Sequence, residues 1–287
     1  MFAGYPTSAG PPIHLPGPEP GPAWERMRRA LGDNGAVVVY GWLPAWIPTP
    51  ASLPRLRERL GRDWRRYQAL RQPRLRERFA AARLLLRSAA AAAMETTPEL
   101  IDLAYQPGGR PYLRGCDQID INLSHTGDII VVGMNRSGRI GVDVERADRS
   151  MVGGGAESRA CTPFERRQLR RLSRAERNAE LLQVWTLKEA YSKAIGQGLR
   201  FRFTEFGFDL GAPVIRLVRP DGSRTVDERW MFHTWLVEGS YVVSGAVHAT
   251  DYGEAADIRA GTTLDDGLLD ALLSAVGRTL ADQPAEP

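Results

Sequence analysis

The sequence contains little cysteine, histidine or lysine, and these shortages exclude several classes of protein. Its 287 residues include two cysteines, Cys116 and Cys161, whose number and spacing fit neither a disulfide framework nor a zinc site. The four histidines are scattered, which also argues against zinc. No uncharged apolar run approaches the ~18 residues of a membrane span, and the N-terminus lacks a secretory signal pattern. We therefore expect a soluble, cytoplasmic protein with no membrane partner.

The basic residues are unusual in kind. Only two of the 38 lysine and arginine residues are lysine, Lys188 and Lys193, and they lie in one short segment. Because lysine carries a compact ammonium that can approach a phosphate and can give up a proton, this placement favours a functional pair over chance. Residues 55–87 hold twelve arginines and three acidic residues, and residues 166–177 are also rich in arginine. Such runs are usually solvated surface, but this excess also predicts an anionic partner.

Hydrophobic residues make up 43% of the chain and charged residues 25%, which is typical of globular proteins. The mixture of strand and helix patterns predicts an α+β fold. We expect strands at Ala36–Tyr40, Ile119–His125, Asp128–Met134 and Ile140–Glu145, helices at Leu53–Leu70, Arg74–Ala93, Phe164–Leu172 and Leu181–Gly196, and four short strands between residues 206 and 247.

The ends of the chain and one internal loop have a different composition. Residues 1–22 contain seven prolines and four glycines, which predicts a flexible leader that buries little apolar surface. The glycine run at 153–155 is expected to be a linker within the loop 146–163, since no strand precedes it. Apolar positions over 264–280 predict an amphipathic terminal helix.

The segment 140–145 alternates aliphatic residues with Gly141, Asp143 and Glu145. In a strand, this period of two puts both carboxylates on one face, close enough to share a hard cation such as Mg²⁺. The alternative is the solvated face of a half-buried strand.

The segment 185–193 places Trp185, Glu189 and Lys193 on one helix face, with Lys188 one position round. It offers a third carboxylate for the cation and two ammonium groups for a polyphosphate; the alternative is a single helix ion pair.

Ser124 and His125 are neighbours, so a strand points their side chains to opposite faces, which argues against a serine hydrolase. Either residue can hydrogen-bond to a phosphate oxygen, and the alternative is a polar strand end.

The order and spacing of these motifs resemble the 4′-phosphopantetheinyl transferase superfamily, in its larger two-lobed class. The matching segments are Arg110-Pro111, Asn122 to His125, Gly141 to Glu145, and Trp185-x-x-Lys188-Glu189-Ala190-x-x-Lys193-x-x-Gly196-x-Gly198-Leu199. The resemblance covers roughly residues 36 to 249 and implies two similar α/β lobes related by a pseudo-twofold axis. The implied divisions are a leader over 1–30, an N-terminal lobe over 31–140, a C-terminal lobe over 141–250 that carries the metal site, and an extension with the terminal helix over 251–287.

The resemblance also implies a reaction, namely Mg²⁺-dependent transfer of 4′-phosphopantetheine from coenzyme A to a serine of an apo acyl or peptidyl carrier protein. Adenosine 3′,5′-bisphosphate would be released, as by a holo-acyl-carrier-protein synthase that serves fatty acid, polyketide or nonribosomal peptide synthases. The implied Mg²⁺ ligands are Asp143, Glu145 and Glu189, and the implied coenzyme A contacts are Arg83, Arg110, Ser124, His125, Lys188 and Lys193. Glu189 is the expected base, directly or through a metal-bound water, and Lys193 the expected proton donor to the leaving phosphate. We expect an acidic carrier protein as partner, no nucleic acid, and a monomer.

Two other functions fit part of the sequence. A nucleic-acid-binding module would explain the arginine runs but leaves three carboxylates and two lysines unused. An Mg²⁺-dependent phosphohydrolase acting on nucleotides would use the same metal site with water as the nucleophile.

Overall fold

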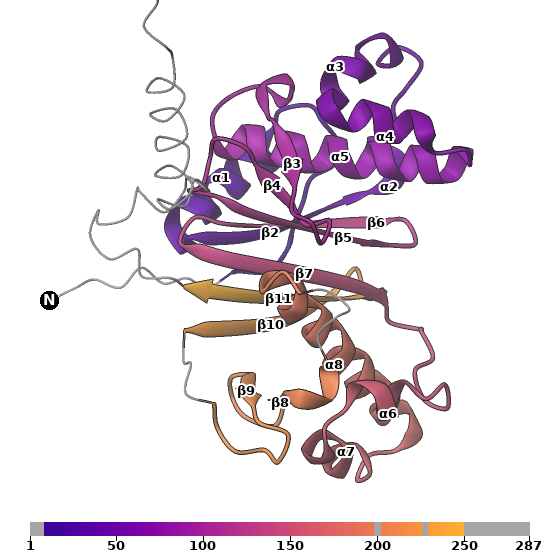
Figure 1. The fold of residues 1–287 in the computed structure, drawn as a ribbon, viewed down its shortest axis with the longest axis vertical. Helices are drawn as coiled ribbons and strands as arrows, with labels where there is room; N and C mark the ends of the chain where they lie inside the picture. Colours follow the sequence, from indigo (N-terminus) through magenta and orange to yellow (C-terminus); the bar gives the residue numbers. More distant parts are fainter. Residues whose placement is uncertain (1–8, 198–201, 226–228, 250–287) are drawn as a thin grey trace, which may run out of the picture. The chain divides into compact units, whose positions relative to one another are not determined.

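The computed structural model describes residues 9–197, 202–225 and 229–249, and in these ranges one arrangement of elements occurs twice (Figure 1). The first copy contains β2 (Ala36–Trp42), α5 (Pro73–Ala93), β3 (Leu103–Tyr105), β4 (Pro111–Leu113), β5 (Asp120–Thr126) and β6 (Ile129–Asn135). The second contains β7 (Gly138–Arg146), α8 (Arg174–Ala194), β8 (Gly207–Asp209), β9 (Arg216–Val218), β10 (Trp230–Val237) and β11 (Tyr241–Ala249). Each copy is thus a strand, a long helix, a small hairpin and a final hairpin.

The two copies also share their sheet topology. The strand orders are β2-β6-β5 and β10-β11-β7, so in each copy the last long strand lies between the first and the second. All of these pairings are antiparallel, and α5 and α8 both have 21 residues. The predicted α+β fold of two similar lobes is therefore confirmed.

The two sheets pack face to face, with α5 outside the first sheet and α8 outside the second (Figure 1). Val37 and Val39 of β2 belong to the core beneath α1 (Pro22–Asn34) and α5, whereas Val38 faces the second sheet. Along β7, Val142 and Val144 join this inter-sheet core. The opposite face of β7 is consequently turned toward α8, because side chains of a strand alternate between its two faces.

The segment expected as a flexible leader is folded from residue 9 onward. β1 (Ile13–His14) pairs in parallel with β2, and Leu15 is fully buried. Helix α1 begins at Pro22, a position where proline costs no hydrogen bond. For residues 9–22 the expectation of a flexible, unburied leader is wrong, since proline-rich chain also suits a short edge strand and a helix start.

Other elements differ from the predictions in their limits. The region Leu53–Leu70 is divided into η1 (Leu53–Arg55), α3 (Leu56–Leu60), η2 (Gly61–Asp63) and α4 (Trp64–Ala69). The division falls at Gly61, whose φ of 53° is incompatible with a continuing helix. Helix α8 begins before the predicted Leu181, because Ser173 and Glu176 form a capping box.

The remaining short elements are α2 (Leu43–Trp46), η3 (Pro98–Leu100), α6 (Ala156–Ala160), α7 (Pro163–Leu169) and η5 (Phe203–Glu205). Helix α6 lies in the segment 146–163 that was expected to be a loop. The amphipathic helix predicted over 264–280 lies outside the described residues. In the part of the chain that is described, no helix has the length and apolar character needed to cross a bilayer. The predicted division of the lobes between residues 140 and 141 stays a prediction, and it falls within β7.

Side chains join β5 to β7 where the two sheets meet. Every second side chain of β5 contacts β7: Asp120 and Asn122 accept from the Ile140 and Val142 amides at 2.7 and 3.0 Å, and Ser124 and Thr126 donate to Asp143 and Glu145 at 2.9 and 3.4 Å. Residue numbers rise together along both strands, so the strands run in the same direction. We call this set of contacts the β5–β7 seam, and it fixes the register of the two carboxylates of β7 relative to β5.

Gly141 determines how closely α8 approaches β7. A Cβ atom at this position would lie 1.9 Å from the Ala190 carbonyl oxygen and 2.6 Å from the Ala194 nitrogen. Both are backbone atoms of α8, which cannot move aside without displacing the helix. The absence of a side chain at residue 141 therefore allows α8 to pack directly on the strand.

We predict that Gly141→Ala lowers the free energy of unfolding by at least about 1–3 kcal/mol, because the added methyl group overpacks the contact between β7 and α8. Urea unfolding followed by circular dichroism measures this loss. Gly32→Ala in α1 is the matched control, since no heavy atom lies within 4 Å of a Cβ there and alanine favours a helix. Equal unfolding midpoints for the two variants would contradict the prediction.

Candidate functional site

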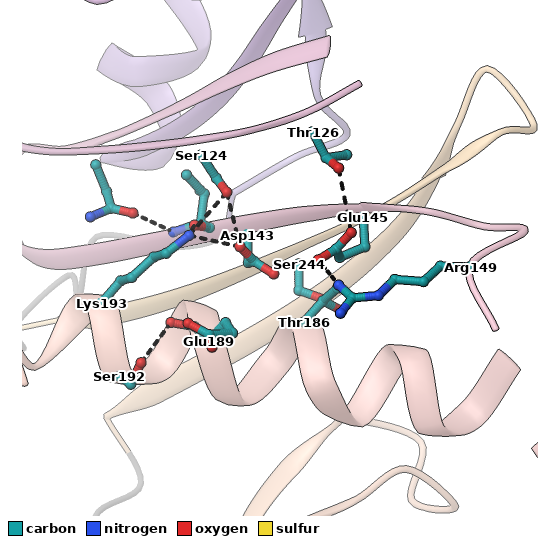
Figure 2. A network of polar contacts seen from close by, with 12 residues as sticks. Ser124, Thr126, Asp143, Glu145, Arg149, Thr186, Glu189, Ser192, Lys193 and Ser244 are labelled. Atoms are coloured by element: carbon teal, nitrogen blue, oxygen red, sulfur yellow. Dashed lines mark hydrogen bonds and ion pairs between the residues drawn. The ribbon is translucent and has the colours of Figure 1, made fainter. Parts of the chain in front are cut away.

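The side chains predicted to bind a metal lie between β7 and α8, as Figure 2 shows. Asp143 and Glu145 are on the face of β7 that meets the helix, and Glu189 and Lys193 are one turn apart on α8. The close contact at Gly141 brings these two surfaces together. The sequence prediction that both strand carboxylates share a face is confirmed, and that face is covered by the helix.

Lys193 contacts the carboxylate of Asp143 directly. Its Nζ lies 2.7 Å from Asp143 Oδ1, 2.9 Å from Ser124 Oγ and 3.2 Å from the Val142 carbonyl oxygen. The Lys193 side chain is 25% exposed and that of Asp143 is 9% exposed. A largely enclosed carboxylate is thus neutralised by an ammonium group that still reaches the surface.

The three carboxylates influence one another electrostatically. Burial raises the pKa of Glu145, and the charge of Asp143 raises it further, while Arg149, which is paired with Glu145, opposes this effect. Burial also raises the pKa of Glu189, to which the charges of Asp143 and Glu145 add. The proximity of like charges makes this pocket unfavourable for three anions unless positive charge is present.

One arginine and one lysine, Arg149 and Lys193, supply that positive charge. Across residues 9–197, 202–225 and 229–249, no three Asp, Glu, His or Cys side chains are gathered closely enough to hold a metal ion. Lys193 instead contacts Asp143, and Arg149 contacts Glu145. The donor chemistry nevertheless suits a hard divalent cation, since carboxylate oxygens are its preferred ligands and Asp143 lies near enough to Glu145 and Glu189 for its charge to raise the pKa of both.

A cleft of about 480 Å³ opens beside these residues. It is lined by Arg66, Phe79, Ala82, Arg83, Gly109, Pro111, Leu123, Ser124, His125, Asp143 and Lys193. The lining residues up to His125 belong to the first copy of the fold, and Asp143 and Lys193 belong to the second. The charged lining is mainly positive, which suits a phosphorylated ligand.

Arg83 is held in the wall of the cleft by an enclosed network. Its Nε lies 3.4 Å from Asp63 Oδ2, and its guanidinium lies over the rings of Phe79 and Tyr105, at 4.9 and 5.3 Å from their centroids. Asp63 also accepts a hydrogen bond of 2.6 Å from the Tyr105 hydroxyl. The Arg83 side chain lines the cleft, and its contact with coenzyme A stays a prediction.

Ser124 and His125 both line the cleft but face different groups. The Ser124 hydroxyl belongs to the β5–β7 seam and contacts Lys193, whereas the His125 ring is exposed at the surface. Protein packed around His125 keeps water from its charged form and so lowers the pKa of the imidazole. The charges of Arg78, Lys193 and Arg83 lower it further. The imidazole is therefore neutral at pH 7 and can donate or accept a hydrogen bond.

Lys188 lies away from the cleft, and its predicted role as a pyrophosphate contact is wrong for this structure. The side chain is fully buried, and its ammonium is surrounded by a carboxylate oxygen of Glu165 at 2.7 Å and by three carbonyl oxygens. These carbonyls belong to Ala160, Phe203 and Phe206, at 2.6 to 2.7 Å. Three ammonium protons facing four oxygens leave none for a ligand. The cause is helix geometry, because Lys188 precedes Glu189 by about 100° of rotation.

Arg110 is also turned away from the cleft. Its guanidinium contacts Asp120, the Ile140 carbonyl and the Lys193 carbonyl. Gly109 and Pro111, its neighbours, line the cleft, but Arg110 does not. The structure thus does not bring Arg110 to the place that the resemblance implies.

Sequence reasoning missed Arg66 and Phe79 of the cleft and Asp120 of the seam. No local pattern marks Arg66 or Phe79 among the many arginines and apolar residues of residues 55–87. Asp120 was detectable in principle, because polar residues at 120, 122, 124 and 126 alternate with other residues along β5. Such an alternation is typical of a solvated strand face, whereas here it contacts a second sheet.

We predict that the two lysines differ in their effect on stability. Lys188→Met should lower the free energy of unfolding by about 3–5 kcal/mol, because it leaves the buried Glu165 carboxylate without its partner. Lys193→Met, at a partly exposed pair, should cost about 1 kcal/mol or less. Chemical denaturation of both variants tests this, and equal losses would show that Lys188 is not the structural lysine.

Comparisons with known proteins identify the family of this chain. A sequence profile of the 4′-phosphopantetheinyl transferase superfamily matches residues 139–245, which include Asp143, Glu145, Glu189 and Lys193. A phosphopantetheinyl transferase of Thraustochytrium sp. is 31% identical over 228 residues, covering 74% of this chain and 78% of that protein.

Two bacterial relatives match a shorter stretch. A putative 4′-phosphopantetheinyl transferase of Synechocystis sp. is 32% identical over 136 residues, or 47% of this chain and 54% of that protein. A 4′-phosphopantetheinyl transferase of Bacillus subtilis is 28% identical over 127 residues, or 44% of this chain and 55% of that protein. The matched length of the Thraustochytrium protein, together with the profile match over the site, shows that the chain belongs to the 4′-phosphopantetheinyl transferase superfamily.

Proposed function

We propose that this protein transfers 4′-phosphopantetheine from coenzyme A to a serine of an apo carrier protein and releases adenosine 3′,5′-bisphosphate. The observation that supports this reaction best is the cleft between the two copies of the fold, whose positively charged lining adjoins the carboxylates of β7 and α8. A ligand with phosphates at two positions fits such a lining. The activity is that of a holo-acyl-carrier-protein synthase serving fatty acid, polyketide or nonribosomal peptide synthases.

Residues of both copies hold coenzyme A in this proposal. Arg83 and His125 bind phosphate oxygens of the adenosine portion, Ser124 does so when its hydroxyl proton turns from Asp143 to the ligand, and Lys193 binds the diphosphate. The support is that all four side chains line one cleft. Arg83 and Lys193 carry positive charge at neutral pH, and Ser124 donates through its hydroxyl. The fourth, His125, donates through a neutral ring.

Asp143, Glu145 and Glu189 would hold Mg²⁺, for which carboxylate oxygens are suitable ligands. When bound there, the ion neutralises the diphosphate and makes it a better leaving group. The raised pKa of Glu145 and Glu189 supports a site that needs added positive charge. The Lys193 side chain is 25% exposed, so its ammonium can exchange its contact with Ser124 or with the Val142 carbonyl for one with the diphosphate.

Glu189 takes the proton from the carrier serine, directly or through a water, in this proposal. The serine oxygen then forms a bond to the phosphorus that carries pantetheine, and the bond from that phosphorus to the bridging oxygen breaks. The leaving group is adenosine 3′,5′-bisphosphate, to which Lys193 donates a hydrogen bond or a proton. A carboxylate that also holds a metal ion is a weak base, which favours the route through a water, and Lys193 lies beside the same carboxylate cluster.

We predict that this chain modifies an apo carrier protein in the presence of coenzyme A and Mg²⁺. Intact-mass spectrometry should show a phosphopantetheine added to the carrier, and chelation with EDTA should abolish this addition. Asp143→Asn and Glu189→Gln should each reduce the rate by roughly a hundredfold or more, because each removes a ligand or the base. Glu180→Gln, on the same helix, is the matched control and should retain the wild-type rate.

The outcomes separate this function from the alternatives. Release of the bisphosphate without any change in carrier mass would indicate a phosphohydrolase. No reaction with either substrate, together with retained binding to DNA or RNA, would indicate a nucleic-acid-binding module.

An acidic carrier protein is the partner that this surface suits. A hollow of about 780 Å³ beside α3 and α4 is lined by Arg57, Glu58, Gly61, Arg62, Trp64 and Arg65. Arg57 and Arg65 are exposed, and neither has an ion-pair partner among the described residues. Unpaired arginines at a concave surface favour association with a partner of opposite charge.

We predict that the double substitution Arg57→Glu and Arg65→Glu raises the KM for the carrier severalfold without changing the KM for coenzyme A. Raising NaCl toward 1 M should have the same effect on the wild-type protein, because salt screens exposed charges. Arg26→Glu with Arg29→Glu in α1 is the control, since it makes the same charge change on another element. A carrier KM that depends on neither salt nor these residues would reject this docking surface.

A further inference from the structure

Arg110 connects three segments at the end of the β5–β7 seam. Its guanidinium donates to Asp120 of β5, to the Ile140 carbonyl of β7 at 2.8 Å, and to the Lys193 carbonyl of α8. The side chain is 9% exposed, so these contacts are largely shielded from water. One planar group with several donors is needed to reach acceptors on three elements, and arginine provides it.

The turn that carries Arg110 lies against the end of α8. Between β3 and β4, the Gly109 amide donates to the Gln106 carbonyl at 2.7 Å, and the Gln106 amide donates to the Arg110 carbonyl at 2.9 Å. A Cβ atom at Gly108 would lie 3.6 Å from the Gly196 carbonyl oxygen. The turn therefore presents a cation to the C-terminal end of a long helix, where the helix dipole favours positive charge.

The contact between Arg110 and α8 matters because Lys193 is held both at its backbone carbonyl and at its side-chain ammonium. Arg110 holds its backbone carbonyl, and its ammonium contacts Asp143 and Ser124. Asp120, the partner of Arg110, also accepts the Ile140 amide, three residues before Asp143. A single guanidinium thus fixes the helix that carries Lys193 and the strand that carries Asp143.

We propose that Arg110 is a positioning residue that aligns Lys193 with Asp143, and that it does not contact the 3′-phosphate of coenzyme A. The inference rests on the proposed function, whose site it concerns. The cleft supports it, because Gly109 and Pro111 line the cleft while the guanidinium between them is committed to Asp120 and two carbonyls.

The test compares coenzyme A with 3′-dephospho-coenzyme A as substrate for an apo carrier protein that the wild-type chain modifies. Arg110→Gln should lower kcat by roughly ten- to a hundredfold, because a small misplacement of reacting groups costs that much. The KM for coenzyme A and the preference for coenzyme A over the dephospho form should remain within about twofold of wild type. Asp120→Asn should give the same pattern, although a carboxylate cannot be a phosphate contact. Arg114→Gln, at an exposed arginine just after β4, is the matched control and should change none of these values.

Two results would overturn the proposal. A phosphate contact at Arg110 would make Arg110→Gln reduce the preference for coenzyme A by about ten- to a hundredfold while Asp120→Asn leaves it unchanged. An unchanged kcat in both variants would show that the contacts of Arg110 position nothing.

If Arg110→Gln does not fold, Arg110→Lys replaces it, because lysine keeps the charge but loses the planar fork. A positioning role requires a lower kcat for Arg110→Lys, whereas a wild-type kcat would overturn the proposal.

A binding measurement separates failure of this inference from failure of the proposed function. Calorimetry with adenosine 3′,5′-bisphosphate and with adenosine 5′-monophosphate needs no carrier protein. Arg110→Gln should keep the wild-type ratio of the two affinities, and amide hydrogen exchange in the last turn of α8 should become faster. If the wild-type chain modifies no carrier, the proposed function fails, and these two measurements still decide whether Arg110 contacts phosphate or holds the helix.

Discussion

The β5–β7 seam is the constraint on which the rest of the site depends. The two sheets meet along strands that share no backbone ladder, so their relative register has to be fixed by side chains. Asn122 bonds to the Val142 amide, and Ser124 bonds to Asp143. Because strand side chains have a period of two, a shift by one residue would turn Asp143 away from α8. The hydrogen bonds of the seam therefore hold the carboxylates of β7 in register with β5, on the face that meets α8.

The positions of the two lysines among the many arginines of this chain follow from the geometry of their surroundings. At Arg83 and Arg110 a flat cation with several donors stacks on rings or reaches separate acceptors. At Lys188 four oxygens surround one nitrogen, and at Lys193 three oxygens do so from one side. A compact ammonium suits such enclosed geometry better than a planar fork does. The two lysines therefore share a geometric requirement, although only Lys193 faces the cleft.

The parts of the fold that could be predicted are those whose signal is local. The aliphatic positions of 140–145 and the apolar pattern of Arg74–Ala93 mark elements that the structure contains, β7 and α5. The repeat was not visible in the sequence, since it lies in topology and helix length rather than in residue identity. The folded part of the N-terminal segment was missed because proline content alone cannot distinguish an exposed tail from chain that pairs with β2. At the site, residue types were predictable, but the direction of Lys188 and Arg110 depends on tertiary contacts that no local spacing encodes.

The sequence distances across the site bear on the order of its assembly. The seam joins residues only 19 or 20 positions apart, such as Ser124 with Asp143 and Asn122 with Val142. Lys193 reaches Ser124 over 69 positions, and Arg110 reaches the Lys193 carbonyl over 83. Closing a short loop costs less chain entropy than closing a long one. The three consecutive strands β5, β6 and β7 can therefore align the two carboxylates during early folding, and α8 then docks onto a template that is already formed.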